Sequence, residues 1–426
     1  MKDFIITSVV ARETLSDLMC TAMEVTVTLA GGKTGTATYA PGVAFGPWYG
    51  KDLFDAGERY AGKGMKEALG HINGCIVPAL VGMDARMQSE MDEAIIAALV
   101  QKNIPLATNV TSPVSFAVLK AGAASLGMPL FQYVGGVFAH KIPVPGFLCA
   151  NGSSRYANNP QAFGRPYYAF VAYDFETHDE ADYALWEVES AWEKIAPKEF
   201  GVRIHHTSSR AIPKGRVAND GELMEILASA IKTAGFEGKV GLHADFAATA
   251  YYDAEKAVYS GIFDGKDRDA NEMVALMTEL PKKHPLVIIQ DPLAAHDTEG
   301  FAAITRGTDI AVAASDLFGA DLARLEECAA KKCFNTAVLR VHKYPTFSAC
   351  VQATAICARY DIGLMPMDTA GEDLDIVQYA AGFRAGSIGM SGLSSHGNAM
   401  GLVEDEIGPR VSFFGKHGLM GPRFKL

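Results

Sequence analysis

Four polar residues stand where short apolar segments end in the second half of the chain. They follow one another at intervals of 25, 25 and 28 residues, and they are Gln290, Ser315, Arg340 and Asp368. This interval is the length of one strand plus one helix in a parallel α/β barrel, whose strands all end on the same face. We therefore expect an amide, a hydroxyl, a guanidinium and a carboxylate to meet at one mouth.

Arg340 and Asp368 offer the clearest chemistry in this set. A guanidinium at a strand end is a two-pronged clamp for a carboxylate or phosphate. The alternative for Arg340 is an ion pair with Asp368 or Asp245 that fills the interior. Asp368 is a candidate general base or metal ligand, and its alternative is a loop cap or a partner for Arg340.

Histidines add two further candidates. His243 lies two residues before Asp245, so strand alternation turns both side chains to the same face. A His-x-Asp pair of this kind suits a transition metal, and the alternative is an interior histidine with its hydrogen bonds satisfied. His205 and His206 end another apolar segment, where alternation allows only one to point inward. We name His206 as the catalytic candidate.

Two arginines flank a loop that is predicted to lie over the mouth. Arg155 and Arg165 would add positive charge for an anionic substrate, although a solvated arginine is the commoner case in loops. With Arg340 they form the predicted substrate-binding set. His342 and Lys343, just after Arg340, are predicted to be ordinary groups at the rim.

Strand patterns separated by helical ones must position these residues. In the second half they predict an α/β barrel, with strands at 147–150, 167–174, 200–206, 239–246, 285–291, 309–316, 336–342, 362–367 and 386–390. The first part instead has strand patterns at 4–13 and 22–40 and then helical patterns from 53 to about 135, which indicates an α+β unit. We predict two domains, 1–140 and 141–426, the second with a basic tail at 409–426.

Composition excludes several classes of function. The 426 residues carry a net charge of −11, from 49 acidic and 38 basic residues, which argues against nucleic acid or an anionic membrane as a partner. No apolar run reaches the roughly 18 residues of a membrane span, so a cytoplasmic location is expected. The seven cysteines form no CxxC pair, which favours reduced, structural thiols.

Segment after segment resembles the enolase family, in order and over almost the full length. The segments include IITSVVARETLSD, RYAGKGMKEALGHIN, IPVPGFLCANGSS, GLHADFAATAYYD, VIIQDPL and NAMGLVEDEIG. The resemblance implies an N-terminal α+β capping domain followed by a modified TIM (βα)8 barrel, and a homodimer or higher homo-oligomer. It also implies proton abstraction next to a carboxylate by a strand-end lysine, with acidic ligands holding magnesium against the enolate.

The residues at the family's chemical positions differ in this chain. The three metal positions fall on Asp245, Gln290 and Ser315, a carboxylate, an amide and a hydroxyl, which make a weakened Mg²⁺ site. The base lysine falls on Arg340, whose guanidinium stays protonated and cannot be a base. The second lysine falls on Gly389. Asp291 and Asp316 lie one residue beyond the metal positions, where strand alternation would turn them away from the mouth unless the strand end is bulged.

Two hypotheses follow. In the first, the chain is a divergent lyase or isomerase for a small anionic substrate, a carboxylate, phosphate or phosphonate, and does not hydrate phosphopyruvate. Arg340 holds the acid group, Asp368 or a histidine moves the proton, and Asp245 orients a metal or a cationic partner. In the second, the chain is a non-catalytic paralogue with a structural, regulatory or binding role.

Overall fold

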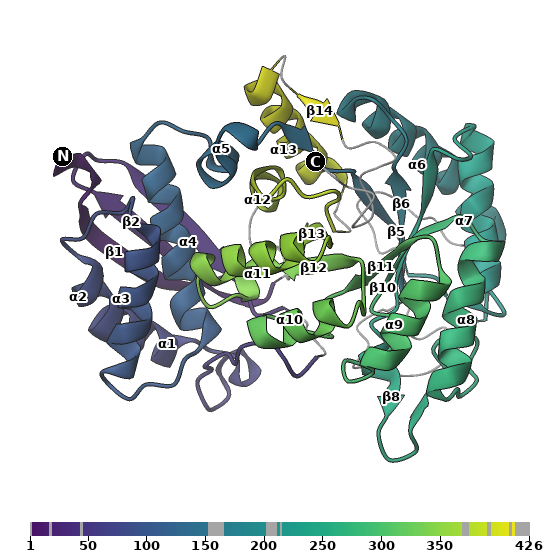
Figure 1. The fold of residues 1–426 in the computed structure, drawn as a ribbon, viewed down its shortest axis with the longest axis horizontal. Helices are drawn as coiled ribbons and strands as arrows, with labels where there is room; N and C mark the ends of the chain where they lie inside the picture. The colour runs from purple at the N-terminus through teal and green to yellow at the C-terminus, as the bar shows by residue number, and fades with distance from the viewer. Residues whose placement is uncertain are drawn as a thin grey trace.

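A computed structural model describes most of the chain. It covers residues 2–16, 19–42, 46–151, 166–201, 211–213, 215–368, 375–389, 393–408 and 411–413. Figure 1 shows an N-terminal sheet with its helices on one side of the molecule and a second, larger set of strands and helices on the other.

The N-terminal part is a three-stranded antiparallel sheet covered by helices. Strands Ile6–Leu15 (β1), Thr21–Leu29 (β2) and Thr34–Tyr39 (β3) are paired in sequence order. The helices are Lys66–His71 (α1), Val77–Leu80 (α2), Gln88–Val100 (α3), Thr108–Ser125 (α4) and Leu130–Gly135 (α5). Helix α4 packs so closely on β3 that a Cβ on Gly35 would lie 2.1 Å from the nitrogen of Ala121. This contact needs a glycine.

The larger part is a seven-stranded sheet in the order β13-β12-β11-β10-β7-β6-β5. Its strands are Gly146–Ala150 (β5), Tyr167–Ala172 (β6), Val240–Asp245 (β7), Leu286–Gln290 (β10), Ala311–Ala314 (β11), Thr336–Arg340 (β12) and Gly363–Met367 (β13). β6 is antiparallel to both neighbours, and the pairs from β7 to β13 are parallel. The carboxyl ends of these parallel strands therefore meet at one mouth, as the spacing of the polar residues predicts.

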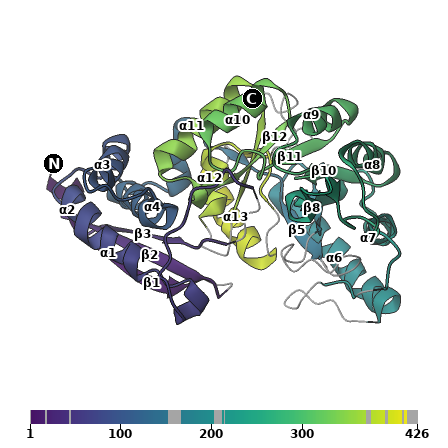
Figure 2. The same ribbon diagram turned by 90° about the horizontal axis from the view of Figure 1, so that it is seen from below.

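Residues 386–389 join the two edges of this sheet. Val144 donates to the carbonyl of Gly386 at 2.9 Å, and Gly389 donates to the carbonyl of Pro366 at 2.8 Å. The sheet thus curls into a modified TIM barrel. Helices lie in an arc outside the strands (Figure 2), and they are His178–Phe200 (α6), Asp220–Ala234 (α7), Ala270–Lys283 (α8), Thr298–Gly307 (α9), Leu322–Ala330 (α10), Phe347–Arg359 (α11), Ile376–Gly382 (α12) and Leu393–Ile407 (α13).

The strand prediction at 200–206 needs a correction at its start. Phe200 is the last residue of α6, which ends at Gly201 in the left-handed conformation, while 202–210 lie outside the described residues. A glycine that ends a helix this way is a common stop signal. Of the predicted tail, Ser412–Phe413 (β14) pairs in parallel with Lys141–Ile142 (β4). A short hairpin, Tyr252–Asp253 (β8) and Val258–Tyr259 (β9), follows β7.

No single helix in the described ranges is long and apolar enough to span a membrane. One pair, Thr108–Ser125 with Leu130–Phe138, meets the criteria of length and composition together but is bent by 98°.

His178, the first residue of α6, lies between two acidic side chains. Its Nε2 is 3.4 Å from Asp182, and its Nδ1 is 3.9 Å from Glu404 on α13. Burial lowers the pKa of His178 below the ordinary 6.5, and the negative charge of Glu404 opposes that shift only in part. His178 is therefore more readily protonated in the unfolded chain than in the folded one.

We expect this histidine to make the protein less stable as the pH falls. Its contribution is complete above pH 6.5, the ordinary pKa, and is lost as the pH drops below that value, because the unfolded state then binds more protons. Urea unfolding at several pH values between about 7 and 5 should show a shallower decline for His178→Gln than for the wild type. Identical slopes for the two proteins would rule out this contribution.

Candidate active site

Arg340 ends β12 and is buried, with 3% of its surface exposed. Its Nε donates a hydrogen bond to the hydroxyl of Tyr49 at 3.1 Å. Within the described part of the chain, the guanidinium makes no direct ion pair with a carboxylate. Burial acts to lower its pKa, but Tyr49 and the carboxylates of Asp316, Asp245 and Asp291 raise it further, so Arg340 stays protonated.

Tyr49 reaches the barrel from the loop that follows β3. Its hydroxyl donates to Asp316 Oδ1 at 3.1 Å while accepting from Arg340. The loop lies directly against the segment after β11, since a Cβ on Gly46 would be 2.2 Å from the carbonyl oxygen of Asp316. Burial, and then the charge of Asp316, raise the pKa of Tyr49, which keeps the phenol neutral. Tyr49 thus holds the arginine and the aspartate in one hydrogen-bonded row.

Asp291 follows β10 with a positive φ of 44°. Its Oδ1 accepts from the backbone nitrogens of Ser315 (2.8 Å) and Asp316 (3.1 Å), and its Oδ2 accepts from the hydroxyl of Ser315 at 2.6 Å. Burial, followed by the charges of Asp316 and Asp245, raises the pKa of Asp291 to about 7. Asp291 and Asp316 contact the other site residues and do not turn away as unbroken alternation predicts, because alternation stops where β10 and β11 end.

Gln290 links Asp291 to His243. His243 Nε2 lies 3.1 Å from Gln290 Oε1, and Gln290 Nε2 lies 3.4 Å from Asp291 Oδ2. Both residues are buried at the ends of neighbouring strands. Burial lowers the pKa of His243 to about 4, although Asp245 and Gln290 act to raise it, so the ring is neutral near pH 7. Asp245 Oδ1 accepts from the backbone nitrogen of Ala247 at 3.1 Å.

Two family models divide the chain between them. The model of the enolase N-terminal domain matches residues 6–134, and the model of the enolase C-terminal TIM barrel domain matches residues 139–420. The chain belongs to the enolase family. Proteins named enolase resemble it along most of their length. That of Methanopyrus kandleri is 29% identical over 96% of this chain and 99% of its own. Those of Thermococcus gammatolerans and Thermococcus kodakarensis are 31% and 30% identical over 90% of each chain.

The structure brings some of the predicted site residues together at the mouth of this enolase-family barrel. Asp245, Gln290, Ser315 and Arg340 lie at adjacent strand ends. Asp368 comes directly after Met367, which pairs in register with Arg340. His206, Arg155 and Arg165 lie outside the described residues.

Gly389, which the resemblance matches to the family's second lysine, has no room for a side chain. A Cβ there would be 2.6 Å from Cγ of Met367. Such a separation is far below van der Waals contact, so a lysine would displace Met367 from the end of β13.

The prediction that His342 and Lys343 are rim groups was wrong, since 1% and 4% of their surfaces are exposed. His342 packs against Phe116, with ring centroids 5.0 Å apart. Lys343 Nζ lies 3.0 Å from the hydroxyl of Tyr39 and 3.5 Å from Asp52 Oδ2. The chain turns inward after β12, where the N-terminal helices and sheet cover it, and strand patterns do not reveal such cover.

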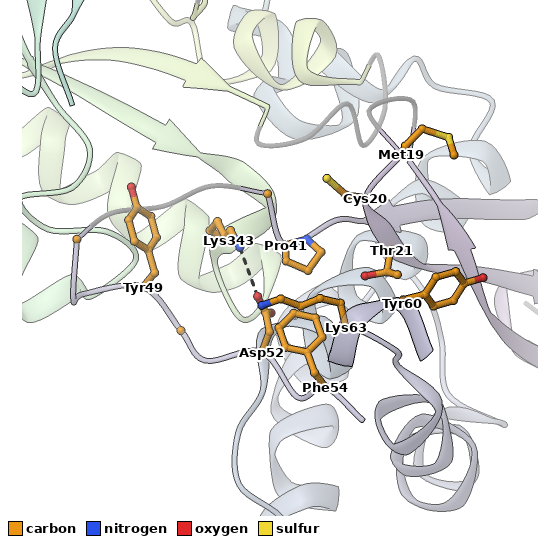
Figure 3. A pocket seen from close by; sticks show the side chains of 13 residues that line it. Met19, Cys20, Thr21, Pro41, Tyr49, Asp52, Phe54, Tyr60, Lys63 and Lys343 are labelled. Atoms are coloured by element: carbon orange, nitrogen blue, oxygen red, sulfur yellow. Dashed lines mark ion pairs between the residues drawn. The ribbon is translucent and has the colours of Figure 1, made fainter. Parts of the chain in front are cut away.

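Lys343 lines a cavity of about 620 Å³. Figure 3 shows Lys343 facing Asp52, with Tyr49 at one end of the cavity and Tyr60 at the other. Tyr49 therefore borders the cavity while its hydroxyl contacts Arg340 and Asp316. Sequence reasoning missed Tyr49, because an aromatic residue in a loop rich in glycine and proline does not reveal which strand end it will contact.

The magnesium that the enolase family uses does not fit these residues. The amide of Gln290 and the hydroxyl of Ser315 are hydrogen-bonded to protein groups, which leaves Asp245 as the one carboxylate among the three residues that the resemblance assigns to the metal. Among the described residues, no group of three or more histidine, cysteine or acidic side chains is arranged to hold a metal ion.

Proposed function

We propose that this enolase-family protein is a lyase or isomerase for a small anionic substrate, with Arg340 holding the acid group. The proposal rests on the surroundings of that guanidinium. It is buried and oriented through Nε by Tyr49, and no described carboxylate pairs with it directly. Its two Nη groups are therefore left to bind a carboxylate, phosphate or phosphonate in a forked geometry.

Asp368 is the proposed proton acceptor. It follows the strand next to Arg340 and is partly exposed, so a substrate held by the arginine would lie near it. His243 is less suited, because a base with a pKa of about 4 is weak near neutral pH and its Nε2 already contacts Gln290. Roles for His206, Arg155 and Arg165 stay predictions.

The proposed chemistry is removal of a proton from the carbon next to the bound acid group. The negative charge that develops there would be stabilised by Arg340, whose position is fixed before the substrate arrives. Hydration of phosphopyruvate is not proposed, because an arginine in place of the base lysine cannot accept the proton.

Ligand binding is the first test. Thermal unfolding is measured with small carboxylates, phosphates and phosphonates, each with and without magnesium. An anion at about a hundred times its dissociation constant should add roughly 2.7 kcal/mol of stability. Arg340→Lys keeps the charge but loses the fork, so binding should weaken by about tenfold or more. Arg359→Lys, at an exposed ion pair with Glu326, is the matched control and should bind like the wild type.

Turnover is tested on the anion that binds. The complex is incubated in D₂O, and loss of the proton next to the acid group is followed by NMR. Exchange that Asp368→Asn abolishes without weakening binding would support the proposed role. Full exchange in that variant would refute it.

The second candidate is a non-catalytic paralogue that keeps the fold and binds a ligand or a partner. The packing of Met367 against Gly389 favours it, because the space for the family's second lysine is closed. Anion binding without proton exchange in any substrate class would select this candidate. The homodimer and the cytoplasmic location stay predictions, and light scattering of the purified protein measures the first.

A further inference from the structure

The hydrogen bonds of Gln290 leave its amide only one workable orientation. As it stands, Oε1 accepts from His243 Nε2, and Nε2 donates to Asp291. The reversed amide would set its oxygen against the carboxylate of Asp291, which is acceptor against acceptor. The amide oxygen is therefore directed to the histidine, and a metal at this position would have to break that contact.

The side chains of Ser315 and Asp291 are likewise occupied by hydrogen bonds, including one between them. The hydroxyl of Ser315 donates to Asp291 Oδ2, and two backbone nitrogens donate to Oδ1. Magnesium requires six oxygen ligands in near-octahedral geometry and draws its affinity from anionic ones. The residues His243, Gln290, Asp291 and Ser315 instead form one continuous hydrogen-bonded chain across the ends of β7, β10 and β11.

Charge is the second obstacle to a divalent cation. The carboxylates of Asp245, Asp291 and Asp316 already act on the Arg340 guanidinium, which is buried in the same place. A dication beside a buried guanidinium would be repelled strongly, because charges interact over longer distances where water is excluded.

We infer that this site takes no divalent cation and that Arg340 supplies its positive charge from within the protein. The guanidinium compensates the negative charge of these carboxylates, as a metal ion does in other proteins. The hydrogen-bonded chain occupies the side-chain oxygens of Gln290 and Ser315, so they are not available as metal ligands. This inference concerns the apo protein and does not depend on the proposed reaction.

Manganese is the probe, because Mn²⁺ takes oxygen ligands as Mg²⁺ does and its free form is read directly by electron paramagnetic resonance. The wild type and Asp245→Asn are titrated in parallel near neutral pH. We expect the same free Mn²⁺ signal from both proteins. One bound Mn²⁺ per chain in the wild type, absent from Asp245→Asn, would overturn the inference.

A second arm tests whether Arg340 is the blocking charge. Gln290→Glu with Ser315→Asp restores acidic side chains at both lost metal positions, and adding Arg340→Met removes the guanidinium charge while keeping a side chain of similar length. We expect Mn²⁺ to bind the triple variant at least about tenfold more tightly than the double variant. Equal affinities would contradict the role given to Arg340. Circular dichroism confirms beforehand that both variants are folded, and the wild-type titration stands whether or not they are.

Discussion

Replacing Arg340 by methionine is expected to lower the free energy of unfolding by about 3–5 kcal/mol near neutral pH. Methionine is similar in length, so the loss comes from charge more than from volume. The carboxylates of Asp245, Asp291 and Asp316 would keep their buried positions without the cation that now compensates them. Urea unfolding followed by circular dichroism measures the loss.

The loss should shrink as the pH falls. Asp291 has a pKa of about 7 in the folded protein, so acid neutralises part of the cluster and reduces the need for a cation. Arg359→Met is the control, because its partner Glu326 and Arg359 itself are exposed, and such pairs contribute less than about 1 kcal/mol. A loss for Arg340→Met as small as that of the control, or one that does not vary with pH, would contradict the account of the charge cluster.

Asp92→Ala is expected to cost about 3 kcal/mol, because a buried carboxylate with several hydrogen bonds is removed. Asp92 on α3 accepts from Ser115 Oγ on α4 at 2.5 Å and from the backbone nitrogen of Ser348 at 2.9 Å. Ser115 Oγ also accepts from the nitrogen of Phe347 at 2.8 Å. Side chains from α3 and α4 therefore accept hydrogen bonds from the first backbone nitrogens of the barrel helix α11, where a negative charge is favourable.

Chemical unfolding measures this effect, and Glu279→Ala serves as the control. Glu279 forms an exposed pair with Lys282, so its removal should change the free energy of unfolding far less than Asp92→Ala does. If Asp92→Ala lowered the free energy of unfolding no more than Glu279→Ala does, the hydrogen bonds of Asp92 would contribute little to holding α3 and α4 on the barrel.

The sequence by itself determined the frame of the site. Apolar strands of regular spacing end at Gln290, Ser315 and Arg340, and the parallel pairing brings those ends together. Backbone periodicity alone dictates this, since every parallel strand followed by a helix returns to the same edge. The barrel could be predicted for the same reason, whereas the family was predicted from the resemblance of successive segments, and the two family models confirm both.

Tertiary structure alone decided what each strand end contacts. Tyr49 meets Arg340 across 291 residues of sequence, and Ser112 binds the carbonyl of His342 across 230. Asp291 joins Ser315 because its backbone leaves the strand conformation, which alternation cannot anticipate. Lys343 is buried because the N-terminal sheet supplies Tyr39 and covers it. Local patterns encode the direction of a strand, whereas the charge balance of a buried site depends on side chains that only the folded chain brings within reach.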